Sequence, residues 1–212
     1  MGWKWNQTAH RYYNTDTGRF LTHARALEFI EQGLAASGSV VDNLAAYVAD
    51  GLLAPGDWYT LMAREVKGEY IRQYLAGIGG RAQMTQADWG SIGGMLKEQY
   101  GHLQGFMEEI AQGKLSEAQI RARARMYTNS AREAYERAHA KVAGQAGNDQ
   151  EIWVLSAAEH CEDCLAFAAE NWQPLGHFPM PGAGHTKCLT NCGCHLEYRK
   201  SETGEVWGEE VA

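Results

Sequence analysis

Apolar residues recur every three or four positions over most of residues 22–147, which is the spacing of helices with one buried face. The longest such seam follows Thr85 and Asp88, two residues that can cap the start of a helix. Its apolar positions are Trp89, Ile92, Leu96, Tyr100, Leu103, Met107 and Ile110. This pattern predicts a long helix packed against other helices.

Three shorter apolar patterns precede this seam. One predicts a helix over residues 24–34, and a second predicts a helix that starts at the capping pair of Ser39 and Asp42. The third begins at Pro55, where proline is tolerated because the first turn of a helix needs no backbone donor. We expect this helix to end at the glycines of residues 77–80.

A last helix is predicted after Ser116 and Gln119, which form a capping box. One face of it carries Ile120, Ala124, Tyr127, Ala131, Ala134, Ala138 and Val142. Because most of these side chains are small, a neighbouring helix can approach closely.

Both ends of the chain depart from this helical pattern. Near the N-terminus, Asn14 favours a turn and Gly18 supplies a positive φ, so a hairpin is predicted over residues 11–21. Trp3 and Trp5 lie upstream on alternate positions, where they either pack under the hairpin or contact a partner. Towards the C-terminus, the composition changes at a predicted linker, residues 144–149. Beyond it the pattern predicts a strand (151–155), a short helix (164–171), an irregular loop (174–184) and two short strands (194–200 and 206–208).

The sequence therefore predicts a mainly α protein in three parts. They are an N-terminal arm with a hairpin (1–21), an α-helical domain (22–147) and a small α+β cysteine-rich module (150–212). No run approaches about 18 successive apolar residues, the length of a membrane span. The first residues also lack the apolar run of a signal peptide, so we expect synthesis in a reducing cytoplasm.

All five cysteines lie in the predicted module: Cys161, Cys164, Cys188, Cys192 and Cys194. So small a module has too few apolar residues to fold well unless a bound metal or a disulfide crosslinks it. Tetrahedral zinc is usually held by two short-spaced pairs of ligands, and Cys161-x-x-Cys164 supplies a typical first pair. The second pair is left open among the other three cysteines. The residues that could each replace one of them are His160, His185 and His195. We expect one structural zinc ion.

Other interpretations of the cysteines stay open. Disulfides formed late, outside the cell, or free thiols packed as small apolar groups would also explain a cluster. A strand, a Cys-x-x-Cys pair and a helix resemble the active turn of thioredoxin-like enzymes, so Cys161 and Cys164 could form a redox couple. A zinc hydrolase with Glu159 as general base is a further alternative, although thiolate-rich sites are more often closed and structural.

The net charge of −7 comes entirely from the C-terminal part. Residues 1–150 carry 16 Lys and Arg against 16 Asp and Glu, whereas residues 151–212 carry 3 against 10. An acidic module is a poor partner for phosphate backbones. A basic stripe is predicted where Arg121, Arg125 and Arg132 share one face of the last helix. Such a stripe suits DNA, but an ordinary solvated helix carries the same pattern and is the favoured interpretation.

The C-terminal motifs resemble those of a known family. They are Cys161-x-x-Cys164, Trp172-x-Pro174, the Pro181-Gly182 loop, Thr186-x-Cys188, Asn191-Cys192-x-Cys194 and a terminal strand. Together they look like the minor head proteins of tailed phages, the head morphogenesis proteins of the phage Mu F-like group. The helical part is more loosely similar, through Thr17-Gly18-Arg19-Phe20, Met84-Thr85-x-x-Asp88-Trp89-Gly90 and the run 127–138. Members often end in His-Pro-x-Cys-Arg-Cys, where this chain has Thr190-Asn191-Cys192-Gly193-Cys194.

This resemblance implies a non-enzymatic structural protein that builds or completes the phage capsid. It implies a place in the virion after assembly in the host cytoplasm, several copies per particle, and the portal or the major capsid protein as partner. Contact with packaged DNA would use Arg121, Arg125 and Arg132. The alternative function is a thiol-redox or zinc-dependent enzyme that uses Cys161 and Cys164.

Overall fold

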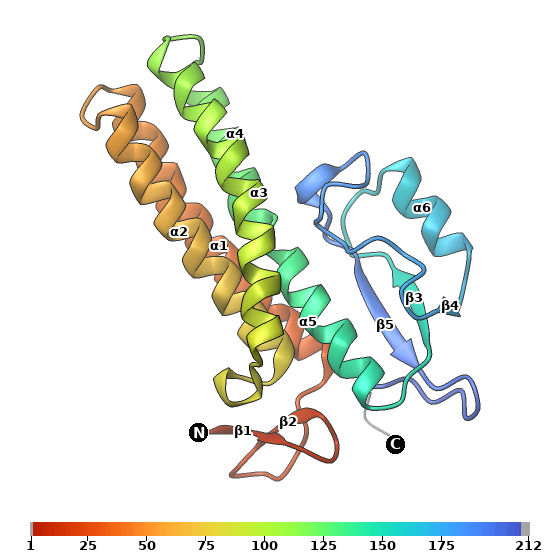
Figure 1. Cartoon of the computed structure of the whole chain (residues 1–212). Helices are drawn as coiled ribbons and strands as arrows, with labels where there is room; N and C mark the ends of the chain where they lie inside the picture. Colours follow the sequence, from red (N-terminus) through yellow and green to blue (C-terminus); the bar gives the residue numbers. More distant parts are fainter. Residues whose placement is uncertain (1, 209–212) are drawn as a thin grey trace.

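The computed structural model describes residues 2–208. It shows a bundle of long helices, a short β-ribbon at one end of the bundle, and a small α+β module at its side (Figure 1). The predicted fold class, mainly α with a cysteine-rich α+β module, is confirmed.

The N-terminal arm is an antiparallel ribbon of β1 (Trp3–Asn6) and β2 (Arg11–Asn14). The predicted turn that follows is present, and the side chain of Asn14 accepts two backbone hydrogen bonds within it. After this turn the pairing continues through a bridge between Tyr13 and Phe20. The main ladder therefore lies upstream of the predicted hairpin, on the strand that carries both N-terminal tryptophans.

Five helices form the body: α1 (His23–Ala49), α2 (Pro55–Ile78), α3 (Gln86–Ala111), α4 (Glu117–Asn129) and α5 (Arg132–Gln145). A 3-10 turn, η1 (Arg81–Gln83), links α2 to α3. In Figure 1, α1 to α4 rise together to a free end, and α5 runs from the bundle along the module. Within residues 2–208, no helix combines the length and apolar character needed to cross a membrane.

The sequence located several helix ends correctly. Thr85 and Asp88 form a reciprocal capping box at the start of α3, and a second box opens α4 at Ser116. Helix α2 begins at Pro55 and ends at Ile78, and its C-cap is Gly79, whose φ of 94° is a left-handed conformation that glycine adopts without strain. These ends were predictable because each depends on residues adjacent in the chain.

The prediction of two separate helices before Pro55 is wrong. Residues 24–34 and the segment after Ser39 belong to one helix of 27 residues, α1, which starts after its N-cap Thr22. The Ser39 hydroxyl does not cap a helix but donates to the carbonyl of Ala35, one turn earlier. A serine inside a helix can satisfy its hydroxyl in this way, so its presence alone does not mark a boundary.

The prediction of one continuous helix after Ser116 is also wrong, because the chain bends between α4 and α5 at Ser130 and Ala131. Arg132, the first residue of α5, is only 3% exposed and pairs with Glu31 of α1. Arg121, Arg125 and Arg132 therefore do not share one exposed face. The first two stay on the surface of α4, each paired with an acidic side chain.

Helix α2 lies at the centre of the body and packs against α1, α3 and α5. It approaches α5 closely at Gly77. A Cβ added to Gly77 would lie 2.6 Å from the carbonyl oxygen of Tyr135 and 2.8 Å from the Cβ of Ala138. The small residues predicted to allow close helix packing therefore do so here. The largest fully buried side chains of the body are Trp58, Met62, Tyr70, Leu103 and Phe106.

The module is an antiparallel sheet with strand order β4-β3-β5, covered by one short helix. Its elements are β3 (Gln150–Val154), α6 (Glu162–Ala169), β4 (Gln173–Pro174), the 3-10 turn η2 (Leu189–Asn191) and β5 (His195–Arg199). The predicted strand at 206–208 is reduced to a bridge between Val206 and Arg199. The buried positions of β3 and β5 alternate, as expected for a sheet with one covered face: Glu151, Trp153, Leu196 and Tyr198.

The body and the module have separate apolar cores. Trp207 packs against both of them. Helix α5 lies against β5, and Asn129 of α4 donates to the side chain of Asn191 in η2. The module is therefore held on the body by α5, by the contact of α4 with η2, and by the last described residues.

Candidate metal centre

Three short elements bring the cysteines together. Cys161 is the N-cap of α6 and Cys164 lies in its first turn, so both thiols emerge at the same end of the helix. Cys188 and Cys192 flank η2 on its two sides. Cys194 directly precedes β5. All five predicted site residues therefore lie in one cluster.

The distances among the sulfur atoms of Cys161, Cys164 and Cys188 fit three corners of a tetrahedral metal site. Cys161 Sγ lies 3.5 Å from Cys164 Sγ and 3.6 Å from Cys188 Sγ. Cys164 Sγ lies 3.7 Å from both Cys188 Sγ and Cys192 Sγ. With a zinc–sulfur bond of about 2.3 Å, two ligands of a tetrahedron are about 3.8 Å apart. The residues present thus suit a thiophilic ion, whereas bonded sulfur atoms would be only about 2 Å apart.

The five thiols form two groups of three, and Cys164 belongs to both. One group is Cys161, Cys164 and Cys188; the other is Cys164, Cys192 and Cys194. Within each group all sulfur atoms lie within 4.8 Å of one another. Cys164, Cys192 and Cys194 are buried, and Cys161 and Cys188 are half-buried.

The thiols differ in acidity. Burial acts to raise the pKa of Cys161, but hydrogen bonds from the backbone N–H groups of Cys164 and Cys188 lower it to about 7. A hydrogen bond from Cys192 lowers the pKa of Cys194 to about 5. Burial raises the pKa of Cys164, and the hydrogen bond to Cys194 raises that of Cys192. A bound metal would therefore displace protons mainly from Cys164 and Cys192.

Only one of the three histidines proposed as substitutes has a contact with a cysteine thiol in residues 2–208. His160 Nδ1 lies 3.7 Å from Cys194 Sγ. His185 is exposed, and His195 packs against the ring of His23 at 5.0 Å. The sequence did not single out His160, because its position depends on the path of the loop between β3 and α6. Glu159, the proposed general base, is exposed.

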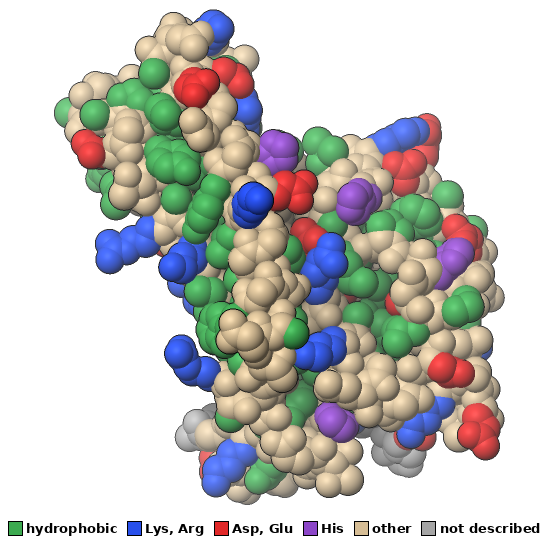
Figure 2. Space-filling model, in the orientation of Figure 1, with side chains coloured by type: hydrophobic (Ala, Val, Ile, Leu, Met, Phe, Trp, Pro, Cys, Tyr) green, Lys and Arg blue, Asp and Glu red, His purple; other side chains and the backbone are tan. Residues whose placement is uncertain are grey.

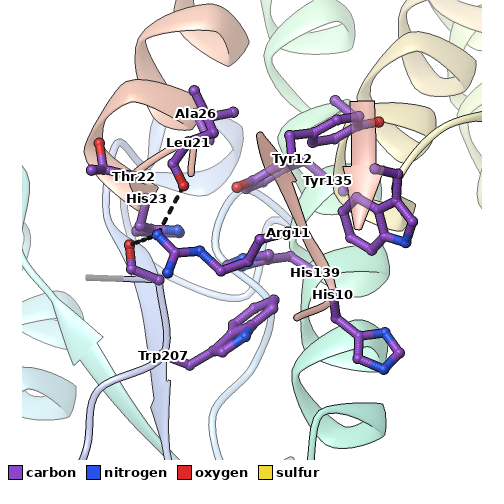
Figure 3. Close-up of a pocket in the computed structure, with 14 residues that line it drawn as sticks. His10, Arg11, Tyr12, Leu21, Thr22, His23, Ala26, Tyr135, His139 and Trp207 are labelled. Atoms are coloured by element: carbon purple, nitrogen blue, oxygen red, sulfur yellow. Dashed lines mark hydrogen bonds between the residues drawn. The ribbon is translucent and has the colours of Figure 1, made fainter. Parts of the chain in front are cut away.

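A second group of titratable side chains lines a cavity of about 50 Å³ between the arm, the body and the last described residues (Figure 3). Arg11 donates to the carbonyl oxygens of Leu21 and Gly208, at 3.1 and 2.8 Å. The rings of His23 and His139 stack with their centroids 4.8 Å apart. Burial lowers the pKa of both histidines, to about 3 for His139, so both rings are uncharged at neutral pH. We interpret this group as a junction that ties the arm to the body.

Comparisons of the chain with family models, with curated proteins and with solved structures found no match.

Proposed function

We propose that this protein is a structural, non-enzymatic component of the head of a tailed phage. In this role a bound metal ion crosslinks the cysteine-rich module, and the module is attached to the helical body. Two lines of support meet here: the C-terminal motifs that resemble phage minor head proteins, and the closed character of the cysteine cluster. The observation that carries the structural role is burial, because Cys164 and Cys194 are each 1% exposed. An ion in such a site crosslinks the chain, and the buried thiolates shield it from a substrate on their side.

Zinc is the ion we propose for the cluster. Thiolate ligands are soft, and they favour zinc over the hard cations magnesium and calcium. The separations of 3.5 to 3.7 Å among the sulfur atoms of Cys161, Cys164 and Cys188 support three ligands of one tetrahedral ion. Zinc also has no redox chemistry of its own, which suits a purely structural part.

The surfaces proposed to contact the portal or the major capsid protein lie on the arm and at the free end of the body. Figure 2 shows apolar side chains on this free end. Tyr47 and Leu52 are exposed near the α1–α2 turn, with Leu52 at 74%. Trp3 of the arm is 42% exposed, whereas Trp5 is half-buried, packing against Tyr12 and the core of the body. Exposed apolar side chains of this kind are typical of protein contacts.

Fewer arginine side chains are exposed for contact with packaged DNA than the sequence predicted. Arg132 is buried, so only Arg121 and Arg125 remain on the surface of α4. Both are already paired, with Glu117 and Asp42 respectively. A protein surface is therefore the favoured partner for this helix.

The location in the particle tests the proposal directly. DNA-filled heads would be purified by density gradient from cells infected with the phage that encodes the chain, and analysed by quantitative mass spectrometry. We expect the chain in the heads at several copies each. Its presence in the lysate and absence from intact heads would contradict the proposal.

One observation favours the alternative, a thiol-redox enzyme: the half-buried Cys161 combines a pKa of about 7 with a position at the start of α6. Such an enzyme would reduce a disulfide-bonded protein such as insulin with dithiothreitol as electron donor. We expect no turnover above the rate of the Cys161→Ser variant. A rate that depends on Cys161 would instead support the enzyme.

A further inference from the structure

An apolar pocket of about 200 Å³ opens between the N-terminal arm and helix α1. Trp3 and Phe29 are each 42% exposed and form its rim. The other large side chains of its walls are Tyr12, Leu21, Ile30 and Tyr135. Tyr12, Leu21 and Tyr135 also line the cavity drawn in Figure 3, so the two adjoin. A cavity of about 150 Å³ can hold benzene, so this pocket has room for one large apolar side chain.

The segments that form this pocket carry an excess of positive charge. Residues 2–30 contain 4 Lys and Arg against 2 Asp and Glu. Lys4 is next to Trp3 on β1, and the guanidinium of Arg25 lies over the Phe29 ring, 5.0 Å from its centroid. The pocket therefore suits an apolar side chain that has acidic residues around it.

Helix α6 presents such a surface, which we call the α6 face. It consists of Glu162, Leu165, Ala166 and Ala169, which are all exposed and whose spacing puts them on one side of the helix. Leu165 is the one large apolar side chain among them and is 51% exposed. Residues 159–170 carry 4 Asp and Glu and no Lys or Arg. The α6 face thus offers a single leucine in acidic surroundings.

The α6 face cannot fill the pocket of its own chain. In Figure 1 the arm lies at the lower end of the molecule, whereas α6 lies on the upper side of the module, away from the arm. A contact between the two surfaces must therefore join two molecules. Because the surfaces are different, each copy in such a head-to-tail contact keeps one of them free for a further copy.

We propose that the apolar pocket of one copy binds Leu165 and the α6 face of a second copy. The leucine side chain fills the pocket, and the acidic residues around it meet the positive charge of the arm and of Arg25. This contact goes beyond the proposed function, because it assigns the pocket beside the arm to another copy of the same chain. The exposed residues at the free end of the body are left for other partners.

Self-association of the full chain tests the proposal. Sedimentation equilibrium would be measured over a series of protein concentrations, with zinc present and a reductant that prevents disulfides between molecules. We expect the average mass to rise from 23.5 kDa towards twice that value and beyond. Added NaCl should weaken the association, because salt screens exposed charges. A mass of 23.5 kDa at every concentration, or association that salt does not weaken, would overturn the proposal and leave the proposed place in the phage head standing.

Two variants distinguish a head-to-tail contact from other kinds of association. Leu165→Ser removes the leucine and keeps the pocket, whereas Phe29→Glu puts a negative charge at the rim of the pocket and keeps the α6 face. Each variant alone should stay monomeric. An equimolar mixture of the two should form a dimer and nothing larger, because only one pair of complementary surfaces remains.

The control is Leu52→Ser, which changes an exposed leucine at the free end of the body and should associate like the unaltered protein. Circular dichroism would establish that each variant is folded. A folded Leu165→Ser variant that associates like the unaltered protein would overturn the proposal. The absence of a dimer from the mixture of Leu165→Ser and Phe29→Glu would do the same.

Discussion

Glu136 of α5 is fully buried, and the fold disfavours its ionised form. Burial raises its pKa to about 7, although the charges of Arg132 and His195 act in the opposite direction. Glu151, on β3, adds to the increase. In the unfolded chain the same carboxyl has a pKa of 4.5. The folded protein thus binds more protons than the unfolded chain between these two values, and its stability falls as pH rises through that range.

Replacing the carboxyl of Glu136 with an amide should remove the fall in stability that accompanies rising pH. We predict that Glu136→Gln gains stability relative to the unaltered protein between pH 4.5 and pH 8, by up to about 3 kcal/mol from the 2.5-unit difference in pKa. Urea unfolding at a series of pH values measures the effect. The control is Glu117→Gln, which removes a carboxylate from the surface of α4. Parallel stability curves for Glu136→Gln and the unaltered protein would contradict the prediction.

Single residues also show what the sequence revealed about the site. The five cysteines were identified from their types and spacing, because few other arrangements of thiols are useful to a small module. The division into two groups was not predictable, since it depends on how η2 turns the chain between Cys188 and Cys192. His160 was only one of three candidates, because nothing in the sequence shows that the loop between β3 and α6 brings its ring to Cys194.

At the scale of elements, the crossing of α2 and α5 depends on the absence of a side chain at Gly77. We predict that Gly77→Ala destabilises the protein by about 1–3 kcal/mol, because the added methyl group must push the two helices apart. The contacts at 2.6 and 2.8 Å involve the backbone and the Cβ of α5, which cannot rotate away. Thermal unfolding followed by circular dichroism would report the change.

An increase in stability is expected when alanine replaces a glycine that also lies inside a helix but has open space around it. Gly93 lies inside α3, and a Cβ there would meet nothing within 4 Å. Gly93→Ala should therefore stabilise the protein by about 0.5–1 kcal/mol, because alanine is the better helix former. Equal effects of the two variants would show that close packing at Gly77 is not what holds the helices together.

Helix ends set by neighbouring residues were predictable, and those set by distant contacts were not. The caps at Thr85 and Ser116 follow from residues three positions apart. The bend between α4 and α5 buries Arg132 against Glu31, about a hundred positions earlier in the chain. A local pattern cannot contain that partner, so the apolar periodicity continued across the bend and one long helix was predicted.

At the scale of the whole molecule, the two apolar cores predict two separable responses to metal removal. The body is stabilised by packing among α1 to α5, whereas the core of the module includes Cys164, Cys192 and Cys194 themselves. A chelator should therefore unfold the module and leave the helices almost intact. Far-ultraviolet circular dichroism at 222 nm should change little, and trypsin should cut at Lys187 between η2 and α6.

The variant Cys161→Ser should reproduce this behaviour without a chelator, because it removes one ligand of the cluster. The matched control Ser201→Ala changes a side chain of the same module that hydrogen-bonds to Asp149 and contacts no cysteine thiol among the described hydrogen bonds, and it should retain its metal. The body and the module are not fully independent, because Trp207 packs against both apolar cores. If α5 needs that contact, metal loss will also reduce the helical signal, but only by the share of one 14-residue helix. Loss of the whole helical signal on metal removal would mean that the body and the module fold as a single unit.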